Sequence, residues 1–121
     1  MQYMALIYGD EEVWANASEE DMAAVYEQYG AFGRAAEEAG VLAGGNELAL
    51  TRNATTVRVR DDETLVTDGP YAEVKEALGG FYLLECTSMD EAIQWASRIP
   101  GAEHGAVEVR PVYVDPEEAQ S

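Results

Sequence analysis

Apolar and polar positions alternate along the chain in a way that predicts short strands around two main helices. Residues 3–8, YMALIY, form an apolar run bounded by Gly9 and Asp10, which is typical of a strand buried on at least one face. From residue 55 the run TTVRVR alternates with period two, so we expect a strand with its valines on the core and its arginines outward. Two further apolar runs, FYLLEC at 81–86 and AVEVRPV at 106–112, predict a central strand and a final strand.

Two segments carry the start signals and the spacing of amphipathic helices. Ser18 followed by Asp21 resembles a capping box, and the helix that it starts should end at Gly40. Ser88 with Glu91 repeats the signal, and Pro100 should end this second helix. The apolar stripes predict that the aromatic residues among them lie in the core: Tyr26, Tyr29, Phe32 and Trp95.

Glycines and acidic turns divide the remaining chain. VLAGG, residues 41–45, begins another strand, and its two glycines indicate a bulge or a close backbone approach. Residues 61–63 predict a hairpin turn, 65–67 a short extended piece, and Asp68, Gly69 and Pro70 a tight turn. Gly79 and Gly80 precede the central strand, where free backbone amides suit a ligand and a bulge explains them equally well.

The predicted element order is strand, long helix, strand, strand, and then strand, helix, strand. This is a ferredoxin-like α+β order with an additional hairpin, in which two main helices cover one face of a mostly antiparallel sheet. The opposite face would be exposed in a monomer. We therefore expect a second copy of the chain to cover it.

The composition indicates a single domain. We assign residues 1–114 to it and 115–121 to an acidic tail. No apolar run approaches the roughly 18 residues of a membrane span, and residues 2–8 are strand-like rather than signal-peptide-like. We expect a soluble cytoplasmic protein without a membrane partner.

The charge balance limits the partners. The formal net charge is −17, from 24 acidic and 7 basic residues, so the chain should repel nucleic acid. Cys86 is the single cysteine, which excludes an internal disulfide, and its apolar surroundings predict a buried core residue. His104 is the single histidine and has no ligand spacing around it, so we expect neither a metal nor a cofactor.

Asp68 is the leading acid or base candidate. A carboxylate at a turn that ends a strand can be partly desolvated beside a sheet pocket, which raises its pKa towards neutrality. The alternative is that Asp68 only fixes the turn by accepting backbone amides. Tyr71, three residues on, offers a hydroxyl that can donate to a ligand.

Several of the few basic residues are ligand-binding candidates. Arg58, Arg60 and Arg110 fall on the polar faces of strands and suit an anionic ligand. The competing interpretation, which we favour, is cross-strand pairing with Glu108 or Glu85. Lys75 and Glu73 follow the Asp68 turn, where they form a weak surface pair or orient Asp68.

The chain resembles the DGPF branch of the YCII-related superfamily over almost its whole length. The similarity covers Ile7 to Gly9 and Gly40 to Gly45, with four runs: TTVRVR from 55, TDGPYAEVKEALGGFYLLE from 67, DEAIQWASRIP from 90 and GAVEVRPV from 105. The resemblance implies a dimeric α+β barrel in which two open sheets meet around a pocket. The branch has Phe where this chain has Tyr71, which implies that this hydroxyl is dispensable.

The resemblance also implies two classes of function. The distant YciI-like branch is associated with a His and Asp acid/base pair, and some relatives act as lyases or dehalogenating enzymes. This chain lacks a histidine in its first strand or helix, so Asp68 and His104 are its catalytic candidates, with Tyr8 as a further proton-transfer group. We favour a homodimer that binds a small molecule with cofactor-free acid/base chemistry. The alternative is a non-enzymatic regulatory module, because many branch members are encoded beside or fused to extracytoplasmic-function sigma factors.

The charge generates a prediction about stability. Repulsion among the carboxylates should be screened by salt, so we expect the melting temperature to rise with ionic strength. A thermal melt at low and at high sodium chloride measures this. A melting temperature that stays flat or falls would contradict the prediction.

Overall fold

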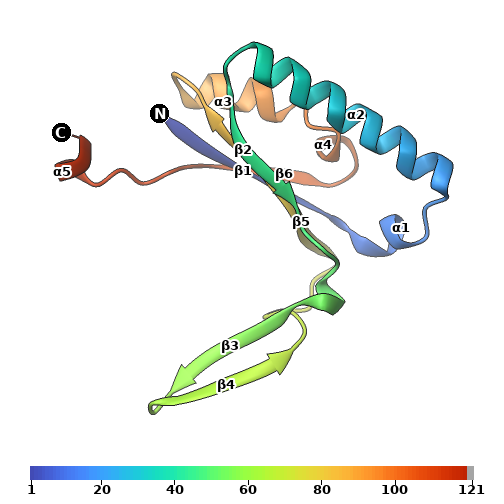
Figure 1. Ribbon diagram of the computed structural model, residues 1–121, viewed down its shortest axis with the longest axis vertical. Helices are drawn as coiled ribbons and strands as arrows, with labels where there is room; N and C mark the ends of the chain where they lie inside the picture. Colours follow the sequence, from blue (N-terminus) through green and yellow to red (C-terminus); the bar gives the residue numbers. More distant parts are fainter. Residues whose placement is uncertain (120–121) are drawn as a thin grey trace.

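The computed structural model describes residues 1–119, and side chains for residues 1–117, and has an α+β fold around a four-stranded antiparallel sheet (Figure 1). β1 (Gln2–Asp10) and β5 (Glu76–Glu85) form its centre. β2 (Leu42–Glu47) pairs with the outer edge of β5, and β6 (Ala106–Pro111) pairs with the outer edge of β1. The predicted element order, including the additional hairpin, is confirmed.

Both main helices begin where the sequence predicts. The Ser18 hydroxyl accepts a hydrogen bond from the Asp21 amide at 3.1 Å and caps α2 (Glu19–Glu38), and Gly40 follows this helix with a φ of 73°. The Ser88 hydroxyl caps α3 (Met89–Ala96) in the same way at 3.2 Å. α3 ends at Ala96, so the prediction that Pro100 ends it was wrong, and Pro100 instead precedes α4 (Gly101–His104).

The core lies between the sheet and the pair α2 and α3, which cover one face (Figure 1). Leu84 of β5 and Ile99 after α3 are its largest fully buried side chains. Phe32 of α2 is buried as predicted, with its ring 4.9 Å from that of Tyr82. Cys86 is also buried, as predicted. The other buried members of this cluster are Tyr3, Ala5, Ala36, Val41, Ala92 and Ala96.

Tyr26 is not a core residue, which corrects the prediction from the helix stripe. Its side chain is 49% exposed, whereas Tyr29 and Trp95 pack against the core. The Tyr26 ring meets the edge of Trp14 in α1 (Glu11–Ala15), and its hydroxyl donates to the Glu47 carboxylate at 3.0 Å. The regular spacing places Tyr26 on the same side of α2 as Tyr29. Its neighbours there are Trp14 of α1 and Glu47 at the end of β2, and not the buried core.

Gly79 and Gly80 lie inside β5 rather than before it, so the strand begins earlier than predicted. The register with β1 shifts between Ile7 and Tyr8, opposite these glycines, which identifies a β-bulge. A Cβ on Gly80 would lie 3.0 Å from the Asn46 carbonyl oxygen of β2, so glycine permits this close approach. The bulge interpretation of the two glycines is confirmed.

β3 (Thr55–Arg60) and β4 (Glu63–Asp68) form a separate two-stranded sheet and do not join the main one. η1 (Thr51–Asn53) connects β2 to this hairpin. The hairpin projects from the body (Figure 1), and Val57 and Val59 are 60% and 58% exposed. The expectation that these valines face the core of the chain was therefore wrong, because β3 pairs only with β4.

The tail assigned to residues 115–121 contains a short helix, α5 (Pro116–Ala119), and its residues 120–121 lie outside the described residues. In the described part of the chain, no helix is long and apolar enough to cross a membrane.

Leu84 provides a test of the core. We expect Leu84→Ala to lower the free energy of unfolding by about 2–5 kcal/mol, because this fully buried side chain would leave a cavity. Val13→Ala, at an exposed position in α1, should change it by less than about 0.5 kcal/mol. Urea unfolding monitored by circular dichroism measures both, and equal losses would contradict this account of the core.

Candidate functional site

One face of the main sheet carries apolar side chains and no helical layer. Residues paired in register share a face, so Met4 and Leu6 of β1 lie on the same side as Leu83 and Phe81 of β5. We call this side the open face, and α2 and α3 lie on the opposite side (Figure 1). Its main apolar residues are partly exposed: Met4, Leu6, Tyr8, Leu78, Phe81 and Leu83.

The β3–β4 hairpin, residues 55–68, forms what we call the arm. Asp61 and Asp62 form its turn with φ values of 51° and 63°, as a two-residue turn between twisted strands requires. The register places Val57 opposite Val66 on one side, the valine face, which also carries Val59. Arg58 and Arg60 lie on the other side. The arm therefore has one apolar and one basic face.

Asp68 ends β4 at the base of the arm, in register with Thr55, on the valine face. The turn is held by its backbone: the Gly69 amide donates to the Ala54 carbonyl at 2.7 Å, and the Thr56 hydroxyl donates to the Gly69 carbonyl at 2.9 Å. Gly69 has a φ of 104°, a region that favours glycine. Within the described chain, the exposed Asp68 carboxylate accepts no hydrogen bond, so it does not hold the turn in the way the alternative interpretation requires.

Tyr71 lies against the basic face of the arm. The Arg58 guanidinium carbon is 4.9 Å from the centre of the Tyr71 ring, a cation–π arrangement, and Tyr71 is 76% exposed. Arg60 donates to the carbonyl of its neighbour Val59 at 2.9 Å. Arg58 and Tyr71 are therefore the predicted site residues that the fold brings together, whereas Asp68 lies on the valine face.

The other predicted site residues lie on different elements. Tyr8 is half-buried on the open face of β1, and Arg110 is exposed on β6. Arg110 is 4.0 Å from Glu108 of its own strand. Glu85 instead binds the N-terminal ammonium of Met1 at 2.7 Å, so the described residues do not show the predicted cross-strand pairing with Glu108 or Glu85.

His104 and Lys75 are not joined to Asp68. His104 is exposed at the end of α4, which packs against β1 and β6, and Lys75 is exposed just before β5. Neither makes a hydrogen bond or ion pair with Asp68 in the described structure, and Lys75 makes none with Glu73. No three His, Cys, Asp or Glu side chains of the described residues lie close enough together to hold a metal ion.

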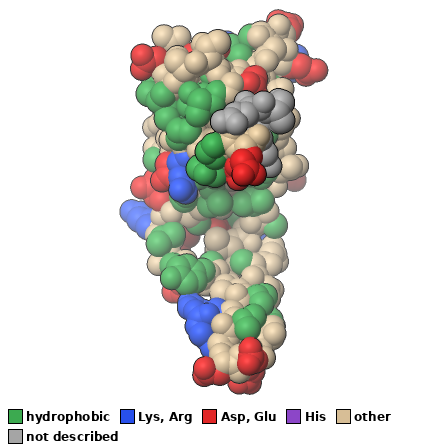
Figure 2. Space-filling view, turned by 90° about the vertical axis from the view of Figure 1, so that its left-hand side faces the viewer, with side chains coloured by type: hydrophobic (Ala, Val, Ile, Leu, Met, Phe, Trp, Pro, Cys, Tyr) green, Lys and Arg blue, Asp and Glu red, His purple; other side chains and the backbone are tan. Residues whose placement is uncertain are grey.

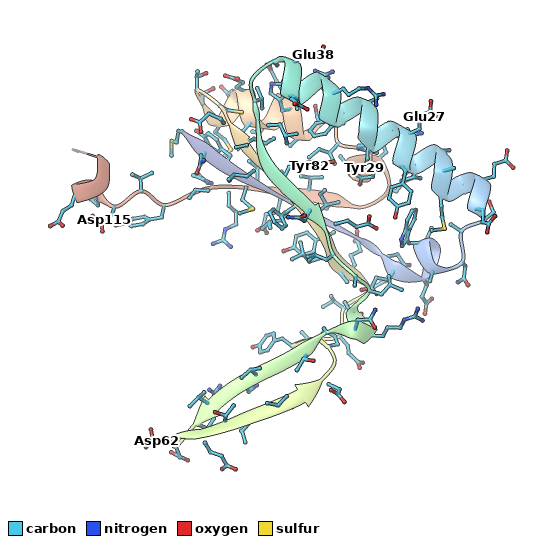
Figure 3. All side chains as sticks on the ribbon, in the orientation of Figure 1. Glu27, Tyr29, Glu38, Asp62, Tyr82 and Asp115 are labelled. Carbon is cyan, nitrogen blue, oxygen red and sulfur yellow. The ribbon has the colours of Figure 1, made fainter. Side chains whose placement is uncertain are left out.

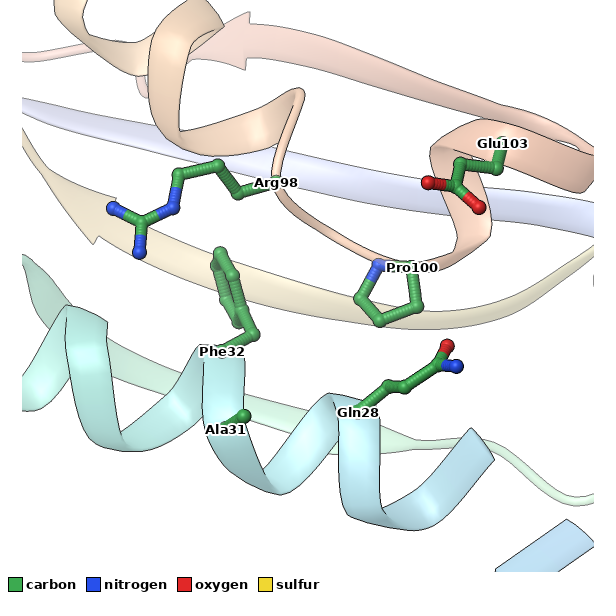
Figure 4. A pocket seen from close by; sticks show the side chains of 6 residues that line it. All are labelled: Gln28, Ala31, Phe32, Arg98, Pro100 and Glu103. Atoms are coloured by element: carbon green, nitrogen blue, oxygen red, sulfur yellow. The ribbon is translucent and has the colours of Figure 1, made fainter. Parts of the chain in front are cut away.

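The hollows of the single chain lie away from these residues. An open groove of about 340 Å³ runs between α2 and the segment after α3, where Phe32 and Arg98 approach each other (Figure 4). The Arg98 guanidinium carbon is also 4.5 Å from the Trp95 ring centre. The lining residues are Gln28, Ala31, Phe32, Arg98, Pro100 and Glu103. None of them is a predicted site residue, so this groove does not contain the predicted site.

The sequence did not reveal one contact near the base of the arm. The Glu11 carboxylate accepts hydrogen bonds from the Thr51 amide and hydroxyl at 3.1 Å, which ties α1 to the start of the arm. No local pattern marks Glu11, because its partner lies 40 residues away.

Tyr29 and Tyr82 lie between α2 and the sheet (Figure 3), and burial raises the pKa of both hydroxyls.

Comparison with known proteins identifies the family. The YCII-related domain matches residues 1–114. The chain belongs to the YCII-related family. An uncharacterized protein of Rhizobium meliloti (strain 1021) is 42% identical to it over 114 residues, which cover 93% of this chain and 92% of that relative. The predicted membership in the YCII-related family is confirmed.

The partly buried Tyr82 of this YCII-related protein predicts a loss of stability in alkali. Because burial raises the pKa of Tyr82, its hydroxyl stabilises the fold below about pH 10, and this contribution is lost as the pH rises through the folded pKa. Urea unfolding at about pH 9 and about pH 11 should show a smaller alkaline loss in Tyr82→Phe than in Tyr113→Phe, whose site is exposed. Equal losses in the two variants would contradict this assignment.

Proposed function

We propose that this protein is a homodimer that binds a small organic molecule between two open faces, in the manner of a dimeric α+β barrel. The uncovered apolar face of the sheet carries this proposal. An antiparallel sheet can expose one face to water, but that face is then polar, whereas here Met4, Leu6, Phe81 and Leu83 occupy it. A second copy would cover these side chains with the same surface, as a two-fold interface requires.

The surface area supports an assembly. The chain exposes 8667 Å², whereas a compact monomer of 13.2 kDa exposes about 6,400 Å². The excess of about 2,200 Å² is larger than the roughly 800 Å² per partner of a standard interface. The excess surface is therefore large enough for an interface of standard size.

The chemistry that we propose is cofactor-free proton transfer with Asp68 as acid or base. An exposed carboxylate is a poor base at neutral pH, and a dry site raises its pKa towards the working pH. Asp68 lies on the apolar side of the arm, where burial in a dimer would desolvate it. Arg110, in register with Met4 of the open face, would bind a carboxylate or enolate-like oxygen, and His104 or Tyr8 would supply a second proton-transfer group.

A regulatory module associated with an extracytoplasmic-function sigma factor is the second candidate. The exposed valine face of the arm favours it, because large apolar patches on one chain mark sites of protein association. In that case the acidic body would meet basic patches on the partner.

Asp68→Asn tests the small-molecule proposal. Native mass spectrometry of the purified protein should show a dimer that retains a small molecule. Asp68→Asn should lower the retained fraction about tenfold or more, because it removes a charge-assisted hydrogen bond. Asp62→Asn, at the tip of the arm, is the matched control and should retain it.

Both variants should keep the dimer and the wild-type melting temperature. Equal retention in the two variants would remove Asp68 from the site. A wild-type protein that is monomeric and empty would overturn the proposal.

A further inference from the structure

The arm lacks the contacts that a two-stranded sheet needs. An isolated hairpin is marginally stable in water, and stable ones pack an apolar face against another layer. Here β3 and β4 make their main contacts with each other, and Val57, Val59 and Val66 are 58–64% exposed. The valine face is therefore built to be covered, and the described part of this chain does not cover it.

We propose that the valine face of each arm packs on the open face of a second copy of this chain. The small-molecule site then combines Asp68 of one protomer with the apolar sheet of its partner. This inference rests on the proposed function and adds to it that each site is shared between two chains.

The shape of the molecule favours a second copy as the occupant. The arm leaves the sheet on the side opposite the helices, so the open face and the arm border the same side of the molecule (Figure 1). In the space-filling view the arm stands clear of the body as a narrow projection (Figure 2). A projection of this kind accounts for part of the excess of about 2,200 Å² over a compact monomer. A two-fold arrangement would cover both arms and both open faces at once.

The charge distribution also favours a second copy. Two chains of net charge −17 repel each other, so contact between them is least unfavourable where the local net charge is small. Residues 51–75 contain four of the seven basic residues, Arg52, Arg58, Arg60 and Lys75, and five of the 24 acidic ones. The rest of the chain carries nearly all of the net negative charge. The arm together with its flanking residues, 51–75, is thus the segment of this chain that an acidic copy repels least.

The position of Asp68 links the arm to the site. Asp68 shares the valine face with Val57 and Val66, so a partner that covers the valines also approaches its carboxylate. Arg58 and Tyr71 lie on the other face, where they stay accessible. The desolvation that acid/base chemistry needs would therefore come from the partner chain.

Two substitutions on opposite faces of the arm test the contact. Val57→Asp adds a charge to the valine face, and Thr67→Asp adds the same charge to the other face at a position that is also exposed. Sedimentation velocity over a dilution series should show that Val57→Asp raises the dimer dissociation constant at least tenfold. Thr67→Asp should change it by less than about twofold, within the ordinary range for surface substitutions. Equal effects of the two variants would overturn the inference.

Removal of the arm tests it independently. The Gly69 amide bonds the Ala54 carbonyl, so two glycines can replace residues 55–68 without separating the ends. We expect a folded monomer with the circular dichroism and cooperative melting of the body. A variant that stays dimeric would overturn the role of the arm and leave the proposed dimer of open faces intact. A wild-type protein that is itself monomeric would overturn both and favour a different protein as the occupant.

Crosslinking locates the contact. p-Benzoylphenylalanine in place of Val66 should, on irradiation of dimers mixed from ¹⁴N- and ¹⁵N-labelled chains, link one chain to residues 2–10 or 76–85 of the other. Links confined to one chain, or to the partner's helices, would overturn the inference.

Discussion

The antiparallel pairing of β1 with β5 is the interaction on which the other elements depend. β1 holds β6 on its other edge, and β5 holds β2, so each edge strand is attached to one of this central pair. Ala5 and Leu84 are fully buried on the side that faces the helices. The helices contribute small buried side chains to the same cluster, at Ala36, Ala92 and Ala96. These small side chains let α2 and α3 pack closely on the sheet.

The same arrangement leaves the molecule with one covered and one uncovered sheet face. Two helices are enough for one face of four strands, and no third layer is present in residues 1–119. The open face and the arm therefore contribute to a total exposed surface that is larger than that of a compact chain of this size. This unbalanced layer structure gives a physical reason for the association proposed above.

The exposure of the open face and of the arm also limits the candidate chemistry. Asp68 sits on a projecting arm and is exposed to water. Acid/base chemistry at a carboxylate is favoured by a dry site, and within the body partial burial raises the pKa of Tyr29 and Tyr82. Any catalytic use of Asp68 thus depends on a surface that this chain does not supply to itself.

The sequence by itself determined the element types, the two helix caps, the bulge glycines and the family, because these depend on local periodicity and on residues close together in the chain. Only the tertiary structure decided that Val57 and Val59 leave the core, that Tyr26 meets Glu47, and that Asp68 shares a face with the valines. Alternation shows that a strand has an apolar face but not which layer covers it. That choice depends on strand pairing and on contacts between distant residues, such as Glu11 with Thr51, which no local pattern encodes.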